Sequence, residues 1–252
     1  MPLRAALFDV GDTLVEHWAS PTRLQELLRE ALRREFGERE WYERWVSAEL
    51  GPGAATFSLT GAAAAPDDDS LRQETLRWYA AWFQSAQIGI DDISLDRLRS
   101  TMCVPLDLVS TPVSGAFAAL RWCKAKGLVV VLVSNTLSRG DAEVWTDWRR
   151  FGVADAIDAV VTSHGVGWQK PHRRIFERAL ELAHARPEEA FMVGDRLDAD
   201  VLGASRLGMR TVWRRTAQAQ LDAGVRPDAV VDDLTQLPAV VEPWLGVPIE
   251  KG

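Results

Sequence analysis

Residues 7–17 read LFDVGDTLVEH, an apolar run that stops abruptly on Asp9 and turns into a polar stretch. Together with the alanines before it, the run predicts a short buried strand over residues 5–8. A carboxylate at the end of a buried strand lowers stability unless a positive group pairs with it. Asp9 is therefore either a solvated turn residue or a group that faces a cation.

The composition is that of an ordinary globular protein. The 252 residues are 47% hydrophobic, enough for one large domain or a domain with an inserted module. The net charge of -7 argues against a nucleic-acid partner, because binding to phosphates needs clustered Lys and Arg. The longest apolar run, residues 128–133, is too short to span a bilayer, and the N-terminus lacks a signal-peptide pattern. We therefore expect a cytoplasmic protein with no membrane partner; the sequence predicts no oligomeric state.

Two patterns divide the chain. Over residues 16–105 the apolar side chains fall at helical spacing, most clearly in residues 22–36 and 71–86. After residue 106, short aliphatic runs alternate with helical patterns. The predicted strands are 128–133, 159–161, 190–193, 211–213 and 229–231, and the predicted helices are 113–126, 141–151, 173–185 and 200–207. Such alternation indicates right-handed βαβ units and a parallel sheet covered on both faces.

The first strand must join the same sheet, so the sequence predicts two parts. We expect an α/β core of the doubly wound, parallel-sheet (Rossmann-like) class, assembled from residues 1–15 and 106–252. An all-helical insert, residues 16–105, lies between the two pieces of this core.

Polar residues follow several of the predicted strands. In a doubly wound sheet, ligands bind at the edge formed by the carboxyl ends of the strands, so these residues should converge there. They are Asp9, Ser134, Asn135, Lys170, Asp195, Asp198 and Asp200.

The predicted pocket holds three or more carboxylates and one lysine. Carboxylates that crowd together have raised pKa values unless a cation compensates their charge. A ligand set made only of hard oxygens favours Mg²⁺ over zinc or copper. Lys170 is suited to offset the charge of an anionic substrate. This combination fits phosphoryl transfer, where catalysis depends on positioning and on neutralising charge.

Four short motifs occur in order along the chain: Asp9 to Leu14, Ser134-Asn135, Lys170-Pro171, and Gly194-Asp195 with Asp200. This set resembles the four motifs of the haloacid dehalogenase-like (HAD) hydrolase superfamily. Each motif is a weak signal alone, but all four stand at or soon after a predicted strand end, across the whole predicted core. The helical insert that follows the first motif resembles the C1 type of cap domain of that superfamily.

The resemblance implies a role for each matching residue. Asp9 matches the nucleophile, which would form a covalent aspartyl-phosphate. Ser134 matches the hydroxyl residue that binds the transferred phosphoryl group, with Asn135 beside it. Lys170 matches the lysine that steadies both the nucleophile and the phosphate.

The resemblance also implies a Mg²⁺ site. Asp9 would bind the metal, together with Asp195 of the fourth motif and its acidic companion Asp200. The family also uses the backbone carbonyl two residues after the nucleophile, which belongs here to Gly11. We expect Asp198 to be a charge at the start of a helix rather than a ligand.

The chain departs from the family pattern at Gly11. Phosphatases of the family usually have a second aspartate there, which acts as general acid and then as general base. Asp12 is displaced by one position, so we expect it to point elsewhere. Loss of such a group costs on the order of 10² to 10⁴ in rate. Our hypothesis is that Glu16, His17 or a group on the substrate substitutes for it.

The leading functional prediction is a Mg²⁺-dependent phosphatase of a small phosphorylated molecule. A 2-haloacid dehalogenase, in which Asp9 attacks carbon without a metal, is compatible with Gly11 but does not account for the acidic residues 195–200. The third hypothesis is a catalytically weak or silent HAD-like protein with a binding or regulatory role. Phosphonatase chemistry needs a lysine in the cap, and residues 16–105 contain none.

Overall fold

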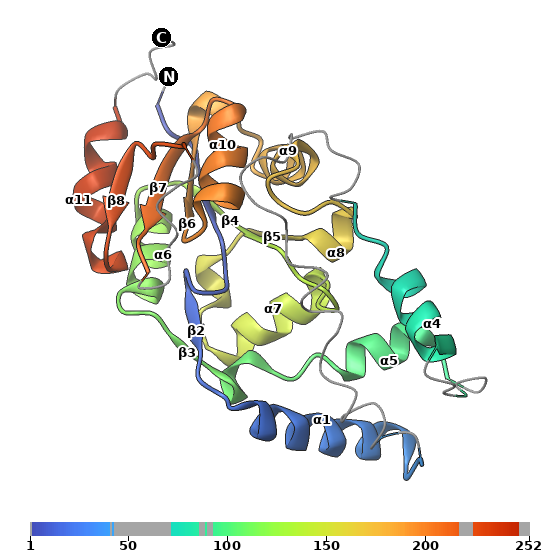
Figure 1. The fold of residues 1–252 in the computed structure, drawn as a ribbon. Coiled ribbons are helices and arrows are strands. Elements are labelled where there is room, and N and C mark those ends of the chain that lie inside the picture. Colours follow the sequence, from blue (N-terminus) through green and yellow to red (C-terminus); the bar gives the residue numbers. More distant parts are fainter. Residues whose placement is uncertain are drawn as a thin grey trace.

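The computed structural model describes residues 2–40, 42, 72–85, 89, 93–216 and 224–246. Its core is a six-stranded sheet in the order β5-β4-β1-β6-β7-β8, with every neighbouring pair parallel (Figure 1). The strands are β1 (Ala5–Phe8), β4 (Val129–Ser134), β5 (Ala159–Thr162), β6 (Ala190–Gly194), β7 (Arg210–Arg214) and β8 (Ala229–Val231). The predicted α/β class and parallel sheet are confirmed.

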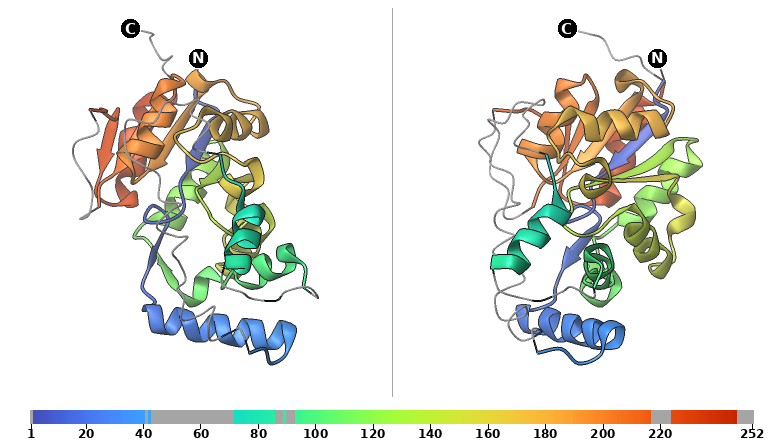
Figure 2. Two further views of the ribbon diagram at one scale, coloured as in Figure 1. Left: turned by 45° about the vertical axis from the view of Figure 1, so that its right-hand side comes forward. Right: turned by 90° about the vertical axis from the view of Figure 1, so that its right-hand side faces the viewer.

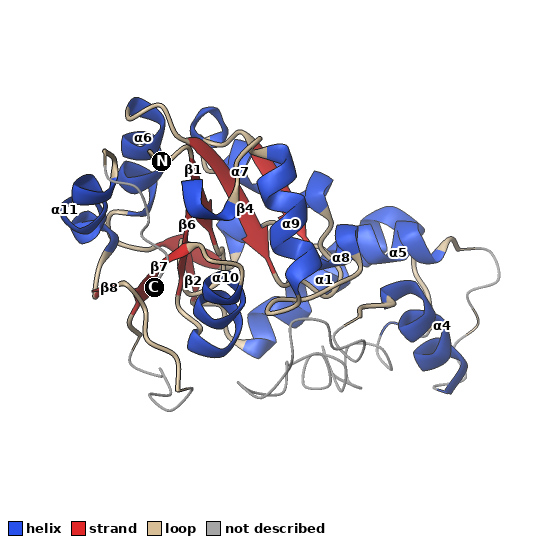
Figure 3. Ribbon diagram, turned by 90° about the horizontal axis from the view of Figure 1, so that it is seen from above, coloured by secondary structure: helices blue, strands red, loops and turns tan. Residues whose placement is uncertain are grey.

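Helices cover both faces of this sheet (Figure 3). They are α6 (Ala116–Ala125), α7 (Asp141–Arg150), α8 (Ser163–Val166), α9 (Arg173–Leu182), α10 (Leu202–Arg206) and α11 (Leu237–Val241). Single 3₁₀ turns occupy Leu106–Leu108, Ala154–Ala156, Pro187–Glu189, Leu234–Gln236 and Glu242–Trp244.

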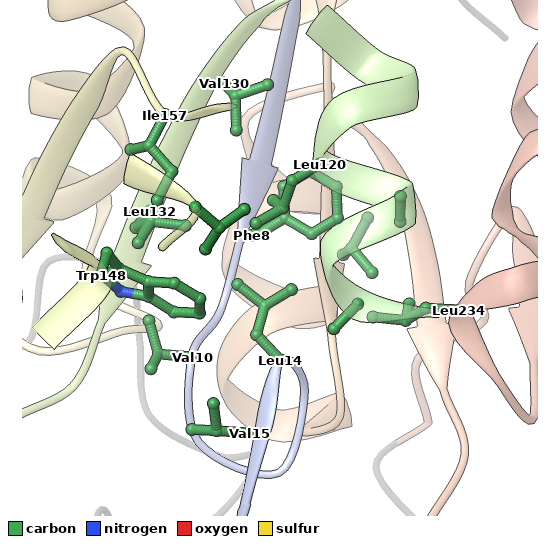
Figure 4. Packing of buried hydrophobic residues seen from close by; sticks show 14 of the residues in the cluster. Phe8, Val10, Leu14, Val15, Leu120, Val130, Leu132, Trp148, Ile157 and Leu234 are labelled. Carbon is green, nitrogen blue, oxygen red and sulfur yellow. The ribbon is translucent and has the colours of Figure 1, made fainter. Parts of the chain in front are cut away.

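Alternate residues of β1 point to opposite faces of the sheet. Ala6 and Phe8 belong to a large hydrophobic cluster with Leu120 of α6 and Trp148 of α7 (Figure 4). Ala5 and Leu7 belong to a second cluster, which includes buried residues of α9 and α10. Because helices bury both faces, the core strands are continuous apolar runs rather than alternating ones.

The described part of the insert contains α1 (Pro21–Phe36), α4 (Thr75–Ser85) and α5 (Leu95–Thr101). The hydroxyl of Ser20 accepts a hydrogen bond from a backbone N–H in the first turn of α1, which is why that helix begins there. The three helices contribute to a small hydrophobic cluster of their own. Figure 2 shows α1 at the opposite end of the molecule from the beginning of β1. The second predicted helix begins later than expected, because residues 72–74 are not helical, and its outer ends, residues 71 and 86, lie outside the described residues.

A two-stranded antiparallel ribbon lies where the insert leaves and rejoins the core. It consists of β2 (Val15–His17) and β3 (Ser110–Pro112). The sequence did not predict it, because three residues are too few to show a period. Residues 16–17 are therefore in a strand and not in the helical part. The domain division at residues 15/16 and 105/106 stays a prediction.

Two predicted helices of the core also begin at other positions. The helix predicted from residue 113 starts at Ala116, because Gly115 before it has a left-handed backbone with φ of 75°. The helix predicted from residue 200 is preceded by a π-helical turn, Leu197–Val201. Such turns are frequent at functional sites. Within the described residues, no helix has both the length and the apolar character needed to cross a membrane.

Replacing Gly115 by Ala should destabilise the fold strongly. A Cβ at this position would lie 2.3 Å from the backbone nitrogen of Thr235, and the left-handed φ adds strain. We expect the free energy of unfolding to fall by about 3 kcal/mol, measured by urea denaturation. Gly152→Ala is the control, because Gly152 also has a positive φ but open space around its Cβ. Its loss should be about 1 kcal/mol, and equal losses in the two variants would contradict this reading.

Candidate active site

The candidate site lies at the carboxyl ends of the three central strands. Asp9 follows β1, Ser134 ends β4 on one side, and Asp195 follows β6 on the other side. The loop after β5 brings in Lys170. β4 and β5 lie on one side of β1, and β6, β7 and β8 lie on the other side. The edge beside β1 is therefore a topological switch point, where sheets of this class bind ligands.

Lys170 forms the centre of this site and is 1% exposed. Its Nζ donates hydrogen bonds to Oδ1 of Asp9 at 2.6 Å and to the carbonyl of Val133 at 2.7 Å. Oδ1 of Asp200 lies 2.7 Å from the same nitrogen as an ion pair without hydrogen-bond geometry. Burial by itself lowers the pKa of Lys170, but the Asp200 and Asp9 carboxylates outweigh burial and raise it. The lysine is therefore charged, with two hydrogen bonds and one further ion pair.

Asn135 holds the backbone of Lys170 from both sides. Its Oδ1 accepts from the Lys170 N–H at 2.8 Å, and its Nδ2 donates to the Lys170 carbonyl at 3.1 Å. The polar groups of Asn135 are thus used within the protein to position the lysine. The buried Ser134 lies next to Asn135. The expected contacts of both side chains with a substrate stay predictions.

Three aspartates form a compact cluster: one carboxylate oxygen each of Asp9, Asp195 and Asp200 lies within 4.8 Å of the others. Oγ1 of Thr13 lies 3.0 Å from Oδ2 of Asp9 and 3.2 Å from Oδ1 of Asp195, and it donates its one proton to one of them at a time. Oδ2 of Asp200 accepts from the backbone N–H of Arg196 at 3.0 Å, which anchors the π-helical turn.

The cluster carries more negative charge than one lysine can balance. Burial raises the pKa of Asp195 to about 8, and the charges of Asp9 and Asp200 add to the shift. Burial also raises the pKa of Asp200 to about 6, although Lys170 opposes the shift. A hard divalent cation would remove this imbalance, and a set of carboxylate oxygens is the donor chemistry that Mg²⁺ prefers. The residues present therefore fit a magnesium site.

Gly194 is required by the packing of this cluster. A Cβ added there would lie 2.3 Å from Cγ of Asp200. Asp198, by contrast, turns away and pairs with the guanidinium of Arg196, at 3.0 and 2.6 Å. Its expected place at a helix start agrees with this geometry.

The backbone of Asp12 has a conformation that favours glycine, whereas the backbone of Gly11 accepts other residues. Asp12 has a φ of 52°, in the left-handed region that favours glycine. Gly11 is outside that region, and a Cβ built on it meets nothing within 4 Å. The Asp12 side chain is exposed. Position 11 can therefore accept a side chain at little steric cost.

Sequence reasoning missed Arg214, at the end of β7. This buried guanidinium donates to the backbone carbonyl of Asp12 and, at 2.6 Å, to Oε1 of Glu16. It braces the turn that follows Asp9, but no sequence pattern relates residues about two hundred positions apart. His17 is engaged as well, because its Nδ1 lies 2.7 Å from Oγ of Ser110. Both proposed substitutes for the general acid thus have protein partners.

Comparisons with known proteins agree with this geometry. A family model described as HAD-hydrolase-like matches residues 167–237. The glyceraldehyde 3-phosphate phosphatase of Pyrococcus furiosus is 31% identical over 178 residues, which are 69% of this chain and 68% of that protein. The protein of the same name from Methanopyrus kandleri is 42% identical over 241 residues, 92% of this chain and 91% of that one.

A solved structure has the same fold. The 2-haloacid dehalogenase from Pseudomonas syringae pv. Tomato DC3000 superposes with a TM-score of 0.63 and 23% sequence identity. The match covers 96% of this chain and 99% of that chain. At this identity the likeness concerns the fold alone.

Replacing Asp195 by Asn should stabilise the protein in EDTA. The folded-state pKa of Asp195, about 8, exceeds the ordinary aspartate value of 3.8, so the folded protein binds this proton more tightly than the unfolded chain. Its contribution to stability is therefore greatest at low pH and is lost as the pH rises towards about 8. At pH 8 the variant should exceed the wild type by about 2 kcal/mol.

The measurement is urea denaturation of both proteins in EDTA at several pH values. The advantage of Asp195→Asn should shrink steadily as the pH is lowered towards 5. An advantage that does not depend on pH, or a variant less stable than the wild type at pH 8, would contradict the charge imbalance.

Proposed function

Because the chain belongs to the haloacid dehalogenase-like (HAD) hydrolase superfamily, we propose that it is a Mg²⁺-dependent phosphatase that acts through Asp9. Two relatives that it matches over two thirds or more of their length are named glyceraldehyde 3-phosphate phosphatases. A small phosphate ester is therefore the substrate class that we propose for this chain. The buried contact between Lys170 and Asp9, at 2.6 Å, is the observation that carries the proposal.

In this proposal Asp9 is the nucleophile. Lys170 holds one carboxylate oxygen of Asp9, and Thr13 contacts the other, so the group is oriented before substrate arrives. A carboxylate oxygen of Asp9 attacks phosphorus as the bond from phosphorus to the ester oxygen breaks. In place of the acid missing at Gly11, Glu16, His17 or a group on the substrate gives the leaving oxygen its proton. Water then attacks the phosphorus of the aspartyl-phosphate, which releases phosphate and restores Asp9.

The phosphoryl group needs positive charge and hydrogen-bond donors. We assign Lys170 the charge and Ser134 a hydroxyl contact, with Asn135 keeping Lys170 in place. The proposed ligands of Mg²⁺ are Asp9, Asp195, Asp200 and the backbone carbonyl of Gly11. When bound there, the metal would supply charge neutralisation at the phosphoryl oxygens.

The dehalogenase alternative is not favoured. Attack on carbon needs a nucleophilic carboxylate but no group of three acidic residues, and this site has three within 4.8 Å. The relatives matched at 31% and 42% identity are named phosphatases. The solved dehalogenase supports only the shared fold.

Asp9→Asn should abolish the activity, because an amide is a far weaker nucleophile than a carboxylate. The test is the release of phosphate from a panel of small phosphate esters, with Mg²⁺ and with EDTA. The wild type should release phosphate in the presence of Mg²⁺ and not in the presence of EDTA. Asp198→Asn is the matched control and should keep the wild-type rate, because Asp198 pairs with Arg196 outside the cluster. Release in EDTA, or none from the whole panel, would contradict the proposal.

Gly11→Asp should raise the phosphatase rate by a factor on the order of 10² to 10⁴, since it restores a group able to transfer a proton. The side chain fits, because nothing lies within 4 Å of the added Cβ. The gain should be largest for esters with poor leaving groups, compared by kcat/KM. Gly11→Asn has the same shape without the acid and should give no gain. A folded Gly11→Asp variant with the wild-type rate would show that a missing acid is not the limitation.

A further inference from the structure

A short piece of the insert lies against the core loop that carries Lys170. Arg72 forms an isolated antiparallel bridge with Trp168, and the backbone N–H of Gln73 donates to the carbonyl of Gly167 at 2.7 Å. The guanidinium of Arg72 lies 5.8 Å from the centre of the Trp168 ring. Figure 1 shows this segment leaving the neighbourhood of α8 and leading into α4.

The side chain of Gln73 reaches a second core loop. It is only 6% exposed, and its Nε2 donates to the carbonyls of Thr136 and, at 3.3 Å, of Leu137. These residues directly follow Ser134 and Asn135 at the end of β4. A single residue of the insert thus bonds to both loops that carry the proposed phosphoryl-binding groups.

The two loops are also bonded to each other. Asn135 pairs with the backbone of Lys170, as described above. Oγ of Ser163 donates to the carbonyl of Thr136 at 2.9 Å and accepts from its N–H at 2.9 Å. Gln73 therefore adds a link from the insert to two loops that are already hydrogen-bonded to each other.

Only the NH₂ group of the Gln73 side chain forms the hydrogen bonds described above. Among the described residues, the buried Oε1 of Gln73 has no hydrogen-bond partner, which is unfavourable for an amide oxygen. Glutamate has the same shape but no donor, and its charge would face two carbonyl oxygens. Gln73→Glu therefore breaks the link without changing the volume.

We propose that Gln73 is a positioning residue that sets the distance of the Ser134 loop from Lys170 and so determines how tightly the phosphoryl group binds. This inference rests on the proposed phosphatase function. Ser134 and Lys170 are the groups that we assign to the phosphoryl group, so a change in their separation should weaken phosphate binding. Such a displacement, by about 1 Å, can also lower the rate about 10²-fold.

The experiment compares Gln73→Glu and Gln73→Met with Gln84→Glu, the same change at an exposed position of α4. It measures kcat and KM for a small phosphate ester, and the dissociation constant of inorganic phosphate by calorimetry, both with Mg²⁺. In Gln73→Glu, KM and the phosphate dissociation constant should rise together, by about 10-fold or more. Gln73→Met should lie between it and the wild type, and Gln84→Glu should match the wild type.

A purely structural role would lower the urea midpoint of Gln73→Glu and leave KM and phosphate binding unchanged, and this result would overturn the inference. Calorimetry needs no turnover, so it separates this inference from the proposed function. If the wild type binds phosphate but hydrolyses no ester, the proposed function fails, and the comparison of dissociation constants still decides on Gln73. A wild type that neither hydrolyses an ester nor binds phosphate would overturn both, and one that hydrolyses esters without measurable phosphate binding leaves the decision on Gln73 to KM.

Discussion

The ammonium of Lys170, buried between Asp9 and Asp200, is the contact on which the candidate site depends. It joins the ends of four elements: Asp9 follows β1, Val133 lies in β4, Lys170 is on the loop after β5, and Asp200 lies in the π-helical turn after β6. A buried charge without partners would destabilise the fold by several kcal/mol. The same contact therefore holds the loops together and keeps the nucleophile oriented.

The surplus of negative charge explains why this arrangement suits a cation. One lysine faces three carboxylates, and the pKa of Asp195 is raised to about 8 as a result of burial and of its charged neighbours. Such an imbalance is unfavourable for the empty site but favourable for a site that binds a divalent metal and an anionic substrate. The same cluster thus lowers the stability of the metal-free protein and raises its affinity for a metal.

Catalytic power and substrate binding depend on two other regions. In the turn after Asp9, Gly11 occupies a position that accepts other residues, and Asp12 occupies one whose backbone favours glycine. The carboxylate of this turn is therefore one position further along the chain than in the family pattern, and it is exposed. Arg214 braces that turn from β7. On the other side of the site, Gln73 connects the insert to the loops that carry Ser134 and Lys170. The proposed chemistry thus depends on contacts between segments far apart in the sequence.

Much of this could be predicted from local sequence. The strand over residues 5–8, the alternation after residue 106 and the polar residues at strand ends all follow from apolar runs that stop where a buried strand must end. The ribbon of β2 and β3, the π-helical turn before α10, Arg214 and Gln73 could not be predicted. Each of them depends on a partner that only tertiary packing brings near. The sequence by itself determined which residues stand at the edge of the sheet, because periodicity and burial act locally. The tertiary structure alone decided which of them touch and how their charges balance, because distance and dielectric environment arise from packing.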